Sequence, residues 1–150
     1  MSSIPELAAL LDRLSAALGD GIHGTAVPNV AVVRSEVKSE QRHTIYRPSV
    51  CIVAQGAKRS IAGRSVLDYG PGQYLTVAVE LPVLGQVIKA SSAAPYLCLK
   101  VELDPAMLSD ILLQHVMPVS ASAESSLGLE VSRVPPEILD AAMRLAKLMD

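Results

Sequence analysis

The sequence predicts a mainly β domain: an antiparallel β-sandwich flanked by an N-terminal helix and C-terminal helices. Between Val30 and Glu102, short runs rich in β-branched residues recur about every ten residues, and turn residues separate them. This spacing is typical of a sandwich or small barrel rather than of alternating βαβ units. The segments on either side carry apolar residues at helical spacing instead. At 150 residues, half of them hydrophobic, the chain is long enough for one domain with a dense core.

The first helix is predicted within residues 1–20. Ser3 and Glu6 form a capping box, and Pro5 is tolerated in the first turn because its missing N–H is not needed there. Gly19 ends the pattern. Apolar residues recur at helical spacing between these signals, at Leu7, Leu10, Leu11, Leu14 and Leu18. This amphipathic helix requires an apolar surface on which to lie.

Residues 28–103 are predicted to form the sandwich. Its seven expected strands are Val30–Val37, Ser49–Gln55, Lys58–Ala62, Ser65–Tyr69, Tyr74–Val79, Val83–Lys89 and Tyr96–Glu102. The last strand alternates clearly, so that its residues divide between two faces. Leu97, Leu99 and Val101 belong to one face, and Tyr96, Cys98, Lys100 and Glu102 to the other.

The remaining residues, 104–150, are predicted to be mainly helical. Asp104 and Pro105 begin a helix that runs to about His115, and a Ser- and Ala-rich linker follows over residues 117–128. Pro135 and Pro136 begin a third helix, which reaches Asp150 without a stop signal. We therefore expect the chain to be cut short before a further domain.

Glycines punctuate residues 55–75, at Gly56, Gly63, Gly70 and Gly72. A phosphate-binding loop needs a Lys and a helix after its glycines, so that backbone N–H groups face the anion. Strand-like runs follow these glycines instead. We interpret them as turns within a sheet.

Composition narrows the function classes. The net charge is −2, and Trp and Phe are absent, which leaves neither a basic surface nor an aromatic platform for nucleic acid. Cys51 and Cys98 are interpreted as reduced thiols, because their spacing fits no metal motif. No signal peptide and no apolar run of about 20 residues is present, so we expect a cytoplasmic protein with no membrane partner.

Three motifs together resemble a known family. They are Gly-x-Lys-Arg at residues 56–59, Tyr-x-Pro-Gly-x-Tyr-Leu at 69–75 and Leu-Asp-Pro at 103–105. This set is similar to the N-terminal regulatory domain of AraC-type bacterial transcription regulators, most densely from Tyr46 to Leu113. The resemblance implies a cupin-like sandwich or jelly roll, followed by a DNA-binding domain with two helix-turn-helix motifs that is missing here. It also implies a role in small-molecule sensing, in dimerisation, or in both, with DNA bound only through the missing domain.

Cupin-like sandwiches are also metalloenzyme scaffolds, so we tested the metal motif on the sequence. With Gly56 as its final glycine, the position of the ligand Glu falls on Ser49, and at most His43 remains as a ligand. One imidazole cannot hold a transition metal, so we predict no metal, no cofactor and no catalytic residues. Cys51 and His43 could form a nucleophile–base pair, but no orienting residue is indicated. A metal-independent enzyme acting on a small molecule remains the alternative.

Five residues are candidates for effector binding. Tyr46, Tyr74 and Tyr96 offer a flat face and a hydroxyl within an otherwise aliphatic core. Lys100 and Arg59 could orient an anionic group. The alternative is that the tyrosines only close the ends of the sandwich.

The third helix is a candidate for dimerisation. Ile138, Ala142, Leu145 and Met149 form a seam that can face a second subunit. The alternative is that the whole stripe packs on its own sandwich or on the missing domain.

Overall fold

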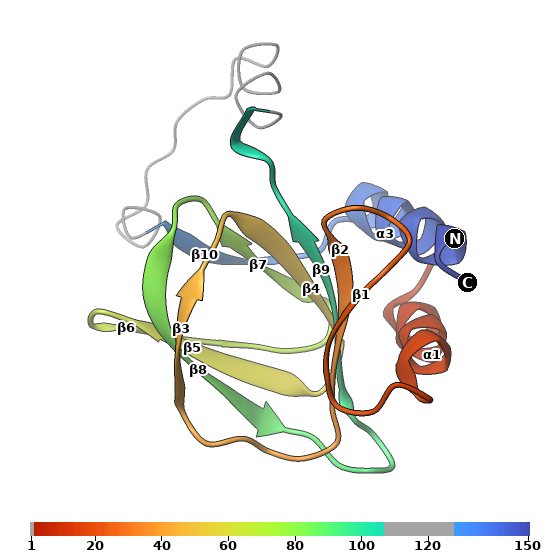
Figure 1. Cartoon of the computed structure of the whole chain (residues 1–150), viewed down its shortest axis with the longest axis horizontal. Helices are drawn as coiled ribbons and strands as arrows, with labels where there is room; N and C mark the ends of the chain where they lie inside the picture. Colours follow the sequence, from red (N-terminus) through yellow and green to blue (C-terminus); the bar gives the residue numbers. More distant parts are fainter. Residues whose placement is uncertain (1, 107–127) are drawn as a thin grey trace.

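The computed structural model describes residues 2–106 and 128–150, and within them it shows the predicted sandwich of two antiparallel sheets (Figure 1). The larger sheet has the order β1 (Gly21–Gly24), β2 (Val30–Ser35), β9 (Tyr96–Glu102), β4 (Ser49–Gln55), β7 (Gln73–Val77) and β10 (Leu129–Arg133). The smaller sheet has the order β3 (Arg42–Tyr46), β8 (Leu81–Lys89), β5 (Ala57–Ala62) and β6 (Ser65–Tyr69). The mainly β fold class with flanking helices is confirmed.

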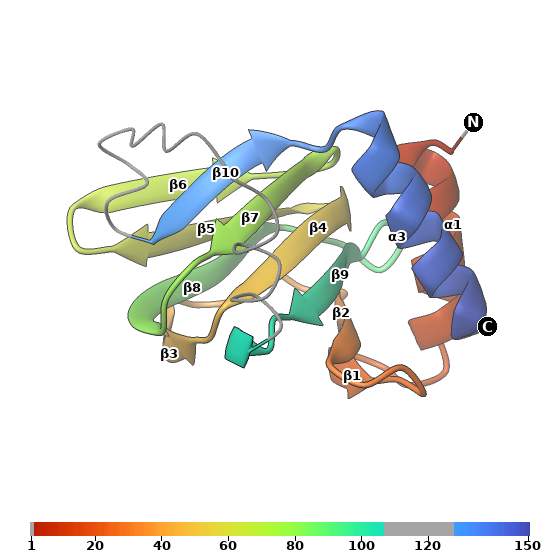
Figure 2. The same ribbon diagram turned by 90° about the horizontal axis from the view of Figure 1, so that it is seen from above.

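Helices α1 (Ile4–Ser15) and α3 (Pro136–Leu148) lie side by side and run in the same direction outside the sandwich (Figure 2). The N-cap half of the predicted capping box is confirmed, because Ser3 Oγ accepts a hydrogen bond from the Glu6 N–H. The Ser2 N–H donates to Asp140 near the start of both helices, at 3.4 Å. Arg13 pairs with Asp150 near the end of both. These contacts hold the two ends of the described chain together.

Two hydrophobic clusters lie on opposite faces of the larger sheet. The outer cluster joins both helices to this sheet, and its core includes Leu7, Leu11, Val32, Ile52, Leu97, Leu99, Leu139 and Ala146. The inner cluster lies between the sheets and includes Val53, Tyr69, Leu75, Val77, Val83, Tyr96, Cys98 and Leu129. The predicted alternation of β9 is confirmed, since Leu97 and Leu99 belong to the outer cluster and Tyr96 and Cys98 to the inner one. This strand therefore separates the helical layer from the interior of the sandwich.

Three strands were not predicted, and their sequence signals are weak or short. β1 has the sequence Gly-Ile-His-Gly, β3 begins with three polar residues, and β10 follows directly on the predicted linker. They occupy outer positions, with β1 and β10 at the two edges of the larger sheet and β3 at an edge of the smaller one. Edge strands bury less of their surface, so their sequences carry a weaker strand signal.

The second predicted helix, from Asp104 to about His115, lies mostly outside the described residues, as does most of the linker over residues 117–128. Only its start is described, where Asp104 Oδ1 accepts a hydrogen bond from the Ala106 N–H at 2.9 Å. The third predicted helix is confirmed from Pro136 onward. The first helix ends at Ser15 rather than at Gly19.

The interpretation of the glycines as turns is confirmed. Gly63 lies in the hairpin between β5 and β6, and Gly56 joins β4 to β5 with φ of 75°. A Cβ at Gly56 would lie 2.6 Å from the Lys89 carbonyl oxygen and 2.8 Å from the Tyr96 Cα. Gly56 is therefore required twice, for its left-handed backbone and for the close approach of two neighbouring segments.

Candidate functional site

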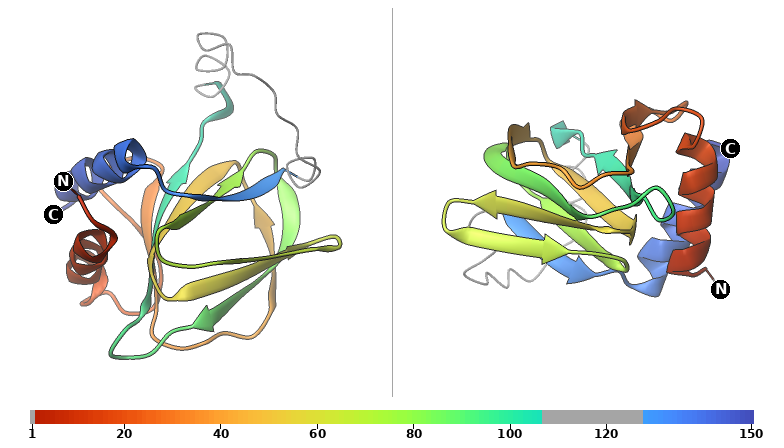
Figure 3. Two further views of the ribbon diagram at one scale, coloured as in Figure 1. Left: turned by 180° about the vertical axis from the view of Figure 1, so that it is seen from behind. Right: turned by 90° about the horizontal axis from the view of Figure 1, so that it is seen from below.

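A cavity of about 640 Å³ lies between the two sheets, which face each other in Figure 3. Its walls come from β1, β2, β4 and β9 of the larger sheet and from β3, β5, β6 and β8 of the smaller one. This volume lies in the range of cavities that hold small organic ligands.

Two thiols and a lysine lie together on the wall formed by the larger sheet. Cys51 on β4 is directly opposite Lys100 on β9, and Cys98 is two residues from Lys100 on the same face. Lys58 enters from β5 of the smaller sheet and also lines the cavity. Its Nζ lies 5.4 Å from the centre of the Tyr46 ring, which is a cation–π distance. The cavity therefore contains two ammonium groups beside two cysteines.

This surrounding changes the acidity of the thiols. Cys98 donates a hydrogen bond to the Cys51 sulfur, and together with the charges of Lys58 and Lys100 this lowers the pKa of Cys51 to about 7. The same hydrogen bond and burial raise the pKa of Cys98, which therefore keeps its proton. Cys51 is thus the thiol that ionises near neutral pH.

Lys58 remains charged in this site. Burial lowers its pKa, but Tyr46 and the two thiols outweigh burial and leave the pKa above its ordinary value. The ammonium therefore provides a positive charge inside the cavity across the neutral range.

Hydroxyl groups line the opposite wall. The Tyr46 hydroxyl lies 3.2 Å from Ser60 Oγ, which lies 2.8 Å from the Tyr69 hydroxyl. Burial raises the pKa of Tyr69, and of Tyr96 on β9 of the larger sheet, well above the ordinary value, so both phenols stay neutral. They can donate hydrogen bonds to a bound molecule without adding negative charge.

The cavity also has an apolar border. Ile22, Val37 and Ile45 line it although each is more than half exposed, which is unusual for such large apolar side chains. Among the described residues that line the cavity, six are Lys or Arg and two are Asp or Glu. The arrangement suits a molecule that combines an apolar part with an anionic group.

Of the five predicted ligand-binding residues, the structure brings three to the cavity. Tyr46, Tyr96 and Lys100 line it. Tyr74 packs against the outer cluster instead, because its position on β7 faces the helical layer. Arg59 forms an exposed ion pair with Asp68 on the β5–β6 hairpin, with its Nε 2.7 Å from Oδ1. These two residues lie away from the cavity in this arrangement.

Sequence reasoning missed most of the lining residues, among them Lys58, Cys51 and Tyr69. The signal for Lys58 was present in the alternation of β5, where Lys58, Ser60 and Ala62 share the inner face and Arg59 and Ile61 the outer one. Cys51 sits in an apolar run, which hid the fact that Lys100 lies opposite it on β9. The prediction of reduced thiols is confirmed, because both cysteines are free.

The residues tested for catalytic and metal roles do not gather at this cavity. His43 lies exposed on β3 and is not among its lining residues, so it does not face Cys51. Within residues 2–106 and 128–150, no three His, Cys, Asp or Glu side chains are grouped to hold a metal ion. In the same ranges, no helix is long and apolar enough to cross a membrane.

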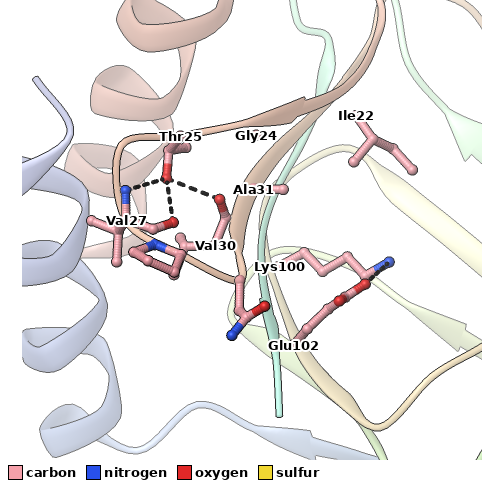
Figure 4. A pocket seen from close by; sticks show the side chains of 10 residues that line it. Ile22, Gly24, Thr25, Val27, Val30, Ala31, Lys100 and Glu102 are labelled. Atoms are coloured by element: carbon pink, nitrogen blue, oxygen red, sulfur yellow. Dashed lines mark hydrogen bonds and ion pairs between the residues drawn. The ribbon is translucent and has the colours of Figure 1, made fainter. Parts of the chain in front are cut away.

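A smaller hollow of about 250 Å³ lies beside the β1–β2 loop (Figure 4). Thr25 Oγ1 closes this loop by hydrogen bonds to the Val27 and Val30 carbonyl oxygens. Lys100 reaches this hollow too, and its Nζ lies 3.8 Å from Glu102. Lys100 therefore borders both hollows, with Glu102 as its nearest carboxylate partner.

The predicted dimerisation seam on α3 is divided by the fold. Ala142 is 4% exposed within the outer cluster, and Leu145 and Met149 pack against that cluster while staying partly exposed. Ile138 is 40% exposed. One side of this seam therefore packs on the chain's own sandwich, whereas Ile138 faces solvent.

Together these features define the class of protein: a cupin-like sandwich domain with an interior cavity of ligand size. The model of the N-terminus of AraC-type transcriptional regulators matches residues 26–150, and the chain belongs to this family. It is therefore a regulatory domain of this class. A search of curated proteins gives no match.

Two solved structures of ToxT from Vibrio cholerae share the fold. An apo variant has a TM-score of 0.55 at 4% identity, covering 85% of this chain and 50% of its own length. Wild-type ToxT with bound unsaturated fatty acid has a TM-score of 0.51 at 7% identity, covering 81% of this chain and 46% of its own. The chain thus spans about half the length of the ToxT chains.

Proposed function

We propose that this domain senses a small molecule in the cavity between its sheets and thereby controls a DNA-binding domain of a longer regulator. The observation that carries the proposal is the 640 Å³ cavity, which combines inward lysines with an exposed apolar border. The family supports the regulatory part of the proposal, because its model describes the N-terminus of transcriptional regulators.

The ligand is an anion with an apolar body, and a fatty acid is the first compound to test. Lys58 and Lys100 attract a carboxylate, because opposite charges attract more strongly inside a cavity than in bulk water. Ile22, Val37 and Ile45 offer the apolar contact for the rest of the molecule. The unsaturated fatty acid bound by ToxT supports the choice of probe.

Thermal unfolding tests this proposal. Monounsaturated fatty acids of increasing length are added below their micelle concentration, with their methyl esters as matched uncharged controls. A ligand at 100 times its dissociation constant adds about 2.7 kcal/mol, or roughly 5–10 °C in Tm for a chain of this size. We expect the acid to raise the Tm and the ester to do so weakly.

Two neighbouring residues on β5 give a matched pair of variants. Lys58→Met removes the inward ammonium and should abolish the shift, whereas Arg59→Met removes an exposed cation on the other face and should retain it. Equal shifts with acid and ester, or equal loss in both variants, would contradict the role of Lys58. If a wider metabolite screen also gives no shift, the domain serves assembly and not sensing.

We also propose that the domain is not an enzyme and that it pairs with a second copy of itself. The exposed position of His43 supports the first part, since within residues 2–106 and 128–150 no imidazole lines the cavity beside Cys51. Ile138 supports the second, because it projects from α3 beside the partly exposed Leu145 and Met149. Sedimentation equilibrium of wild type and Ile138→Glu tests the pairing, and a wild-type monomer at tens of micromolar excludes it.

A further inference from the structure

Cys51 occupies a position that the binding of a carboxylate does not explain. It lines the cavity from the centre of the larger sheet, with Lys100 directly opposite it on β9 and Lys58 facing it from the other sheet. A thiol between two ammonium groups is an activated nucleophile, because positive charge favours the thiolate. The cavity also gives a small molecule direct access to the sulfur.

We propose that Cys51 is a covalent site for soft electrophiles, in particular α,β-unsaturated carbonyl compounds that enter the cavity. The use of such an adduct as a signal rests on the proposed sensing function, whereas the addition itself does not. The partner class follows from the chemistry of the wall: a thiolate attacks an electron-poor alkene carbon, and the lysines favour acceptors that carry a carboxylate.

The addition needs no oxidant. The Cys51 sulfur, after losing its proton to solvent, forms a bond to the β-carbon of the acceptor, and the C=C π bond breaks. Its electron pair moves toward the carbonyl oxygen to give an enolate. The α-carbon then takes a proton from the Lys58 ammonium or from water, and the Lys58 amine regains one from solvent. The product is a thioether that contains every atom of both reactants.

The second thiol favours addition over disulfide formation. The strand register pairs Cys51 with Lys100 and Val53 with Cys98, so the two cysteines are diagonal neighbours. Diagonal Cα atoms lie about 7–8 Å apart in an antiparallel pair, beyond the separation that a disulfide spans. Cys98 instead keeps its proton and donates a hydrogen bond to the Cys51 sulfur. Cys98 therefore stabilises the Cys51 thiolate. It does not compete with Cys51 for the electrophile, because its own pKa is raised.

Tryptic mapping of the whole chain tests the site. Trypsin does not cut between Arg47 and Pro48, so Cys51 lies in the peptide of residues 43–58 and Cys98 in that of residues 90–100. The chain is treated with monomethyl fumarate at pH 7, quenched and digested. We expect the adduct on residues 43–58, with residues 90–100 unmodified. Equal modification of both peptides would overturn the proposal.

Rates and variants distinguish an activated thiol from an accessible one. Folded wild type should react several-fold faster than the chain unfolded in guanidinium, and Lys58→Met should lose part of this advantage, because Lys58 is one of the groups that lower the pKa of Cys51. Arg59→Met should keep it, and Cys51→Ser should give no adduct in a chain whose circular dichroism is unchanged. We also expect Cys51 to react faster with monomethyl fumarate than with dimethyl fumarate, after each rate is divided by the rate of the same compound with N-acetylcysteine. The reason is that only the monomethyl ester carries a carboxylate for the lysines.

A Cys51 rate equal in folded and unfolded chain would refute the proposal even if fatty acids raise the Tm. Conversely, a fast and selective adduct with no fatty-acid shift would refute the choice of reversible ligand and leave the covalent site standing. The two proposals therefore fail separately.

Discussion

The pH dependence of Cys51 alkylation gives the sharpest test of the cavity's electrostatics. The pKa of Cys51 falls from an ordinary value of 9.0 to about 7, chiefly because Cys98 donates a hydrogen bond to its sulfur. At pH 7 roughly half of the Cys51 population is then thiolate, compared with about 1% for an ordinary thiol. Lower basicity also lowers nucleophilicity, by about 8-fold for two pKa units at a Brønsted slope near 0.45. We therefore expect a net advantage of about 6-fold at pH 7.

The shape of the profile is as informative as the rate. The sign follows from the direction of the shift: a thiol with a lowered pKa reaches its full thiolate population at lower pH. Iodoacetamide labelling of residues 43–58 should rise through pH 7 and level off above about pH 8, where an ordinary thiol still gains rate. The groups that face the sulfur are Ser49, Lys58, Tyr69, Tyr96, Cys98 and Lys100.

Variants assign the cause. Lys58→Met and Lys100→Met each remove a positive charge and should move the midpoint upward. Cys98→Ala removes the hydrogen bond and should move it furthest, because that bond is the largest single cause. A wild-type midpoint near 9 that none of these variants changes would show that the lysines and Cys98 do not act on Cys51.

Three other predictions follow from the fold and the composition. Gly56→Ala should destabilise the chain by more than Gly63→Ala in urea unfolding. At both positions an alanine at positive φ costs about 1–2 kcal/mol of unfolding free energy, but only at Gly56 would the added Cβ also meet neighbouring backbone. Equal losses of stability would refute the close approach at Gly56. Elemental analysis of protein purified without chelator should find no stoichiometric transition metal, and a one-to-one metal whose removal unfolds the chain would contradict this. With a net charge of −2, the chain alone should not bind promoter duplexes in a fluorescence anisotropy titration, and submicromolar binding would contradict this.

The sequence predicted correctly those elements for which the local residue pattern and the packing in the folded chain favour the same structure. The capping box at Ser3, the alternation of β9 and the turn glycine Gly56 all came from short patterns whose physical cause is local. β1 and β3 were missed because their residues face solvent or the open cavity, and burial supplies most of the strand signal.

The candidate site was predictable only in part, because a single strand does not reveal what lies opposite it. Tyr96 and Lys100 were assigned to one face of β9 from their alternation, and both line the cavity. Tyr74 was chosen by residue type alone, and it faces the helices. Arg59 was preferred to its neighbour Lys58, although the two alternate between faces. Choosing between them required the register of β5 against β8.

The same alternation explains why binding chemistry gathers in this cavity and not in the helical layer. Outward positions of β9 carry Leu97 and Leu99, since α1 and α3 seal that face and any polar group there would need a partner. The inward face of the same strand borders the cavity, and there Cys98 and Lys100 take the place of leucine. A charge on this face keeps contact with solvent until a ligand displaces the water, and it can then pair with that ligand. The lysines and Cys51 thus lie in the part of the sandwich where solvent stabilises ionisable groups when the cavity is empty. When a ligand binds, it replaces the solvent as their partner.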